Sequence, residues 1–157
     1  MGLWYKVAGA GESTTVTGAW TSSTLTELQI EEWSGLATSN VLDKVAYTTG
    51  TGSTVTSRSS GTTATTSQAE ELAIVGVVNG AIVTNQAWTN SFTVERHASC
   101  VYQTGGSKVL SSAAAIESTM SWTTARHGGG IIATFAAPAA GGTVVPVFMN
   151  QYRQRRA

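Results

Sequence analysis

Apolar residues recur along this chain in short runs, with small and polar residues between them. Many of the runs alternate between apolar and polar positions, which is the period of a β-strand that buries one face. Runs of this kind cover residues 3–8, 14–20, 41–47, 71–78, 92–95, 99–103, 113–122 and 131–135. Their spacing of roughly 8–12 residues, with turn signals between them, predicts an all-β chain folded as an antiparallel, jelly-roll-like β-sandwich.

The stretch from Leu28 to Asp43 has a central place in this pattern. It reads LQIEEWSGLATSNVLD, which predicts a buried strand, a turn at Gly35 and entry into the next strand. Upstream, Thr24 and Glu27 have the spacing of a helix capping box, so a helix is the alternative for residues 24–33. The strand-like runs on both sides, and the glycine that follows directly, favour a strand there.

Glycines mark several of the predicted turns. Residues 71–78, ELAIVGVV, are apolar on both faces and predict a central strand. The Asn79-Gly80 pair after them has the signature of a type I′ hairpin that leads into residues 81–83. The Gly105-Gly106 pair and the run Gly128-Gly129-Gly130 are also predicted as turns.

The composition supports a β-fold without naming a function. The chain has 157 residues, enough for one domain with a sizeable core, and only 11 % of them are charged. Thr, Ser and Gly are abundant, and residues 48–60 hold almost no apolar side chain. That segment is predicted to be an exposed loop or an edge strand that faces solvent.

Charge and cysteine content narrow the classes of partner. Three of the nine basic residues lie at the extreme end of the sequence, so six basic residues face nine acidic ones in the remainder. A nucleic-acid surface would need a basic region on the fold itself, and none is predicted. Cys100 is the only cysteine and is predicted to be a buried apolar residue. No apolar run has the length of a signal peptide core or a membrane span, so no membrane contact is expected.

A family resemblance emerges from the order of the runs. The succession LWYKVAGAGE, IEEWSGL, VLD, AEELAIVGVV and ESTMSWTTARHGGGIIATFAAPA resembles a jelly-roll or immunoglobulin-like β-sandwich module. That module recurs in tailed-phage virion proteins and in bacterial surface proteins. The resemblance covers about Leu3 to Ala139 and implies a sandwich domain over 1–139. It carries no catalytic motif.

Residues 140–157 are predicted to be a linker, a docking strand and a basic tail. Modules of the resembled kind usually have further strands before the LWYKVA run and often lack an extension past Ala139. The segment 143–152 is therefore predicted to fill an unpaired sheet edge in the same subunit or in a neighbour. Pro146 would restrict it to an edge position. The predicted partner-binding residues are Val147, Phe148, Tyr152, Arg153, Arg155 and Arg156.

Arginine suits bidentate contacts with carboxylates on a partner protein, and a disordered solubilising end is the alternative for the tail. Three arginines are too few for strong nucleic-acid binding on their own.

Polar residues offer little catalytic or metal-binding chemistry. Glu27, Glu31, Glu32 and Asp43 form the main acidic concentration, but the spacing of a calcium loop is absent. We expect them to be solvated charges on an exposed strand face, with no metal and no cofactor bound. His97 and His127 are far apart in sequence and lack an activated-serine motif; His127 is predicted to be a turn residue. No catalytic residue is therefore predicted.

Aromatic residues raise the question of sugar binding. Most of the five tryptophans fit alternating strands and are expected in the core. Trp88 lies in the polar context NQAWTN and is the best candidate for an exposed glycan contact, although packing over an open end of the sandwich is an equal alternative.

Together, these features predict a non-enzymatic structural protein of a tailed-phage virion, either a capsid decoration or a tail or fibre component. It would be made in the bacterial cytoplasm and would act as a homo-oligomer in contact with other virion proteins. The alternative is a carbohydrate-binding or host-adhesion module that recognises a host glycan.

Overall fold

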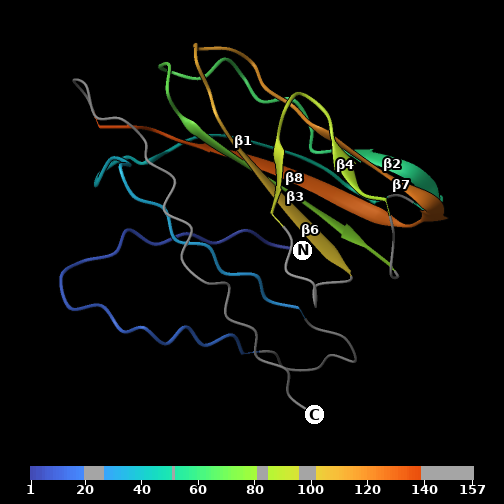
Figure 1. Ribbon diagram of the computed structural model, residues 1–157, viewed down its shortest axis with the longest axis horizontal. Helices are drawn as coiled ribbons and strands as arrows, with labels where there is room; N and C mark the ends of the chain where they lie inside the picture. The colour runs from blue at the N-terminus through green and yellow to red at the C-terminus, as the bar shows by residue number, and fades with distance from the viewer. Residues whose placement is uncertain (20–26, 51, 81–84, 96–101, 139–157) are drawn as a thin grey trace.

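The computed structural model describes residues 1–19, 27–50, 52–80, 85–95 and 102–138. Within these ranges the chain forms eight strands and no helix: β1 (Leu42–Thr48), β2 (Val55–Ser59), β3 (Leu72–Asn79), β4 (Ala87–Trp88), β5 (Thr93–Glu95), β6 (Gln103–Val109), β7 (Thr119–Arg126) and β8 (Gly128–Phe135). One antiparallel sheet has the order β1-β8-β3-β6-β5 and the other the order β2-β7-β4. The predicted all-β antiparallel sandwich is confirmed (Figure 1).

Strand β3 is central, as its apolar character on both faces predicted. It pairs with β8 on one side, where Val75 lies opposite Ile132, and with β6 on the other. Alternate residues of β3 face in opposite directions. Ala73, Val75 and Val77 point to the second sheet, and they form the larger core with Trp88, Phe92, Leu110, Met120, Trp122 and Ile132.

The opposite face of the five-stranded sheet is covered by the beginning of the chain. We call residues 1–19 and 27–41 the covering segment. Leu3, Trp33 and Leu36 from this segment pack against a second buried cluster that contains Leu72 and Phe135. Figure 1 shows the covering segment on the side of β3 and β8 away from β2 and β7. The molecule therefore has three layers, and only two of them are sheets.

The strands predicted at 3–8, 14–20 and 24–33 are wrong for the described residues. The covering segment contains no strand, and residues 27–33 form no helix either. An extended chain turns alternate side chains to opposite sides whether or not it joins a sheet. Here Leu3 faces the sheet while Trp4 is 84 % exposed. Near Leu3 and Tyr5 the alternation thus reflects packing on a sheet face and not pairing with a sheet edge, whereas residues 14–19 are all exposed.

The predicted turn at Gly35 and the strand after it are confirmed. Gly35 has a φ of 76°, a conformation that favours glycine. The chain then returns to the sheet, where the Ala37 N–H donates to the Ala136 carbonyl over 2.9 Å. The strand predicted at 41–47 is found as β1, one residue later.

The predictions of turns at two glycine runs are wrong. Gly105 and Gly106 lie inside β6, and the run 128–130 opens β8. A Cβ on Gly106 would lie 2.6 Å from Trp88 Nε1, and one on Gly128 would lie 2.6 Å from the Val78 carbonyl oxygen. These glycines are needed because other groups approach the strand closely, not because the chain reverses.

A ladder of hydroxyl groups extends the smaller sheet beyond its strands. β2 is an edge strand of that sheet, in agreement with one of the two predictions for 48–60. After it, every third residue is a buried hydroxyl: Ser60, Thr63 and Thr66. Their partners, in the same order, are Ser118, Ile116 and Ala114. In each pair, the backbone N–H of the first residue donates to the partner's carbonyl, and the side-chain oxygen of the first residue accepts the partner's backbone N–H. We call these six residues the hydroxyl ladder.

The remaining strand predictions are partly confirmed. The strand predicted at 92–95 is β5, and the closing strand at 131–135 belongs to β8. The strand predicted at 113–122 begins only at Thr119, as β7, because the residues before it belong to the hydroxyl ladder. The expected hairpin partner at 81–83 lies outside the described residues, and both edges of β3 pair with β6 and β8. The strand predicted at 99–103 falls largely outside the described ranges.

Candidate functional site

The predicted docking residues of the tail lie outside the described part of the chain. This applies to Val147, Phe148, Tyr152, Arg153, Arg155 and Arg156. His97 and Cys100 also lie outside it. Their predicted roles stay predictions.

Trp88 is buried, so of its two predicted roles the structure shows packing and not an exposed indole. Only 8 % of it is accessible, and its Nε1–H donates to the Gly105 carbonyl over 2.9 Å. It pairs with Met120 across β4 and β7 and contributes to the larger core. Ala87 and Thr89 on either side of it are exposed, whereas the carboxamide of Gln86 is buried. Conversely, Trp4, which was expected in the core, is exposed.

The acidic residues near the start do not lie on an exposed strand face, and that prediction is wrong for Glu27 and Glu31. Glu27 Oε2 accepts the backbone N–H groups of Tyr102 and Gln103 over 3.0 and 3.1 Å. Glu31 accepts the Trp33 indole N–H over 3.2 Å. Burial raises the pKa of the Glu31 carboxyl, although the hydrogen bonds from Gln29 and Trp33 oppose the shift. Glu27 thus fastens the covering segment to the sheet.

A second carboxyl pair lies at the end of the sandwich where β1 and β3 begin. Burial tends to raise the pKa of Asp43, but hydrogen bonds from Lys44 and Ser67 hold it below its ordinary value. Burial raises the pKa of Glu71, and its neighbour Asp43 adds to the shift. Pairs of this kind can serve as acid and base. Here Asp43 accepts two hydrogen bonds from Ser67, and Glu71 accepts one from the Gln68 N–H, so the pair clamps a loop to the sheet.

In the described ranges, no group of three or more His, Cys, Asp or Glu side chains is placed to hold a metal ion. The same part of the chain contains no helix with the length and apolar character needed to cross a membrane.

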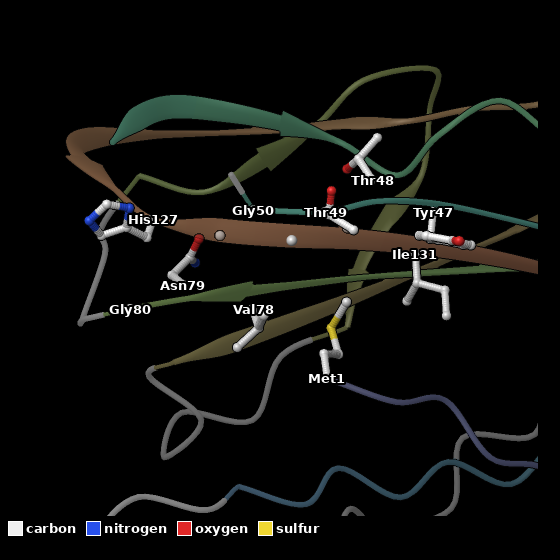
Figure 2. Close-up of a pocket in the computed structure, with 13 residues that line it drawn as sticks. Met1, Tyr47, Thr48, Thr49, Gly50, Val78, Asn79, Gly80, His127 and Ile131 are labelled. Carbon is white, nitrogen blue, oxygen red and sulfur yellow. The ribbon is translucent and has the colours of Figure 1, made fainter. Parts of the chain in front are cut away.

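A pocket lies at the opposite end of the sandwich, where β1 and β3 end and β8 begins. We call it the end pocket. Its volume is about 640 Å³, which falls in the range of roughly 300–1,000 Å³ found for small-molecule sites. Its lining consists of Met1, Tyr47, Thr48, Thr49, Gly50, Val78, Asn79, Gly80, His127, Gly128, Gly129, Gly130 and Ile131. Figure 2 shows His127 and Asn79 at one end of the glycine run and Tyr47 and Ile131 at the other.

The floor of the end pocket is bare backbone, and the path of the chain explains why. After β1 the chain passes close to the start of β8, so that a Cβ on Gly50 would collide with the Gly128 carbonyl oxygen. A Cβ on Gly130 would collide with the Ser59 carbonyl oxygen. Side chains are therefore excluded at Gly50 and Gly130, and the side chains that line the pocket come from the residues around them.

Two residues of the rim have unusual environments. Asn79 is only 2 % exposed, and neither Oδ1 nor Nδ2 of its carboxamide has a hydrogen-bond partner. Tyr47 is 72 % exposed, on the face of β1 turned away from the larger core. Sequence reasoning missed both residues. Asn79 follows an apolar run, but the Asn79-Gly80 pair predicted a hairpin turn and not a buried carboxamide.

His127, predicted to be a turn residue, is exposed and is the single residue between β7 and β8.

The covering segment presents a second surface with a potential function. Half of the ten exposed large apolar residues in the described ranges belong to its first part: Met1, Trp4, Tyr5, Val7 and Val16. Tyr5 also makes an edge contact with Phe135, with ring centroids 5.5 Å apart. Large exposed aromatic side chains of this kind are typical of protein interfaces.

Comparisons of the chain with protein-family models, with curated proteins and with solved structures found no match. Membership of the phage virion module therefore stays a prediction from the sequence.

Proposed function

We propose that this chain is a non-enzymatic structural protein of a tailed-phage particle, and that it acts by docking onto other subunits. The observation that carries the docking role is the exposure of Trp4 and of other apolar residues around it in sequence. An indole that is this exposed gains hydrophobic free energy when a partner covers it.

The rest of the proposal is supported by the β-sandwich and by the resemblance of the sequence to virion modules. The engaged carboxyls add support for a non-enzymatic role. Glu27 and Asp43 both use their oxygens to hold the chain together. They are not grouped around the end pocket, whose lining has no carboxylate.

The test is the native mass of the purified protein by light scattering. We expect a defined oligomer for the full chain and a smaller species for Trp4→Ser. The matched control is Val94→Ser, which changes an exposed apolar residue on β5. A monomer for the full chain, or equal masses for Trp4→Ser and Val94→Ser, would contradict self-assembly through this surface.

The tail is tested separately by a chain that ends at Ala140. If the truncated chain loses the oligomer while Trp4→Ser keeps it, docking would be assigned to residues 141–157 instead. The virion location is tested by mass spectrometry of purified phage particles from the host. Absence of this chain from intact particles would contradict it.

A further inference from the structure

Four polar side chains at one end of the larger core are buried and have no hydrogen-bond partner in the described part of the chain. They supply the carboxamides of Asn79 and Gln86, the hydroxyl of Thr104 and the indole N–H of Trp122. Asn79, Thr104 and Trp122 are only 2 %, 1 % and 4 % exposed. Leaving one such group unpaired costs about 1–3 kcal/mol. Because native proteins nearly always pair such groups with protein or ordered water, four of them together indicate a bound polar molecule.

Asn79 and Thr104 come from the five-stranded sheet and face the smaller sheet. Val77 belongs to the larger core and lies opposite Thr104 across β3 and β6, so these two side chains share a face. Asn79 follows Val77 by two residues, which places it on the same face of β3. Both polar side chains are therefore turned into the space between the two sheets.

Gln86 and Trp122 come from the smaller sheet and face the same space. Trp88 in β4 lies opposite Met120 in β7, and both belong to the larger core. Trp122 follows Met120 by two residues, and Gln86 precedes Trp88 by two, so both turn inward. The register of β4 and β7, continued by one residue, places Gln86 opposite Trp122.

The groups from the two sheets meet at the end of the core next to the end pocket. The Trp88 indole N–H donates to the Gly105 carbonyl over 2.9 Å, so β4 lies over β6. Thr104 is the next residue of β6 toward the end where β3 ends and β8 begins. Gln86 is displaced from Trp88 toward the same end, because its partner strand β7 runs to the start of β8. The Gln86 carboxamide therefore faces the Thr104 hydroxyl across the two sheets.

The chemistry of these groups restricts the ligand. The two carboxamides and the hydroxyl can donate and accept hydrogen bonds, whereas the indole only donates. None of the four side chains carries a charge, so they suit neither a phosphate nor a divalent cation. Asn79 also lines the end pocket, so the polar cluster borders a space of solvent-accessible size (Figure 2). Water is small and uncharged, and it both donates and accepts.

We infer that ordered water molecules bridge the two sheets at this end, hydrogen-bonded to Asn79 and Thr104 on one side and to Gln86 and Trp122 on the other. We call this site the water bridge. Buried waters of this kind are part of a structure and are costly to remove. Their directional bonds favour one alignment of the two sheets, which apolar contacts alone specify less strictly. The water bridge does not depend on the proposed assembly role.

The experiment is NMR of the full chain, in which rotating-frame Overhauser transfer from water to indole protons reports a long-lived bound water. We expect a direct water contact at the Trp122 indole proton. Trp88 is the matched control in the same core, because its indole N–H already donates to the Gly105 carbonyl and should show no water contact. Equal water signals at the two indoles, or no signal at Trp122, would overturn the water bridge.

Gln86→Leu tests whether the water joins the two sheets. We expect the water contact of Trp122 to disappear and the melting temperature to fall by about 2–4 °C, because the three remaining groups lose a shared partner. A dry cluster predicts the opposite, since an apolar side chain would then replace an unpaired carboxamide and raise the melting temperature. Ala87→Ser changes the exposed neighbour and should leave both measurements unchanged. A water contact that persists in Gln86→Leu, or a melting temperature that rises, would refute the bridge.

Discussion

The two faces of the five-stranded sheet are covered in different ways. On one face, the strands β2, β7 and β4 form a second sheet, and Met120 and Trp122 fill the space between the sheets. On the other face, the covering segment has no strands, yet it also buries apolar residues such as Leu72 and Phe135. Both layers remove apolar surface from water. They differ in how their own backbone groups are satisfied.

A sheet satisfies its backbone through its ladders, whereas an irregular layer needs individual contacts. The covering segment is fastened by the Glu27 carboxylate, by Gln29, which donates to the Glu95 carbonyl, and by the Ala37 N–H. Such contacts are not joined in a ladder, so we expect the covering segment to have a lower local stability than the sheets. We infer that the covering segment is the layer best suited to rearrange when a partner docks, while the sandwich beneath it stays intact.

The difference between the two layers is tested most directly by removing one apolar side chain from each layer. Met120→Ala, between the sheets, should lower the free energy of unfolding by about 2–5 kcal/mol, because the side chain is fully buried. Leu36→Ala, in the covering segment, should lower it by only about 1 kcal/mol, because the residue is half-buried. Urea denaturation measures both.

Met120→Leu is the control for the first variant, since it conserves volume and should change stability by less than about 1.5 kcal/mol. Equal losses for Met120→Ala and Leu36→Ala would show that the two layers contribute alike, and the comparison would fail.

The hydroxyl ladder is a third way of satisfying backbone groups, because side-chain oxygens accept hydrogen bonds in a segment that is not a strand. Thr63→Val keeps the shape of the residue but removes the oxygen that accepts the Ile116 N–H over 3.1 Å. We expect a loss of about 1–3 kcal/mol in the free energy of unfolding, while Thr63→Ser should retain most of it. Thermal unfolding gives the difference. Thr65→Val alters an exposed neighbour and should be close to neutral; a loss as large as that of Thr63→Val would argue against the ladder.

The smallest expected effect is the pH dependence that Glu31 gives to the covering segment. Its pKa is raised by burial above the ordinary 4.5, so the folded protein holds this proton more tightly than the unfolded chain. Its contribution to stability is therefore fully present below the ordinary carboxyl pKa and is lost as pH rises through the raised value.

Glu31→Gln lacks this titration, so the variant should gain stability relative to the wild type as pH rises from about 4 to about 8. Denaturation of both proteins across that interval isolates Glu31 from the other carboxyls. If the difference in the free energy of unfolding between the two proteins did not change with pH, the raised pKa of Glu31 would be contradicted.

The β-character of the chain and several of its strands could be predicted from the sequence alone. The apolar run 71–78 identified β3 and its central place, and the runs 41–47 and 131–135 identified β1 and most of β8. The prediction for β3 held because a strand buried on both faces needs apolar residues at almost every position, whatever its partners. The turn at Gly35 held because its positive φ is a local requirement.

Contacts between distant segments determine which extended segments become strands and which residues line the end pocket. Residues 3–8 alternate as a strand does, but they lie on a sheet face and find no edge to pair with. Gly106 is required by Trp88, which comes from a different strand, so a turn signal in the sequence became a strand interior. The end pocket likewise takes lining residues from both β1 and β3, because β8 pairs between these two strands, which precede it by many residues. Contacts between distant segments are not encoded in any local pattern, which is why only the fold revealed them.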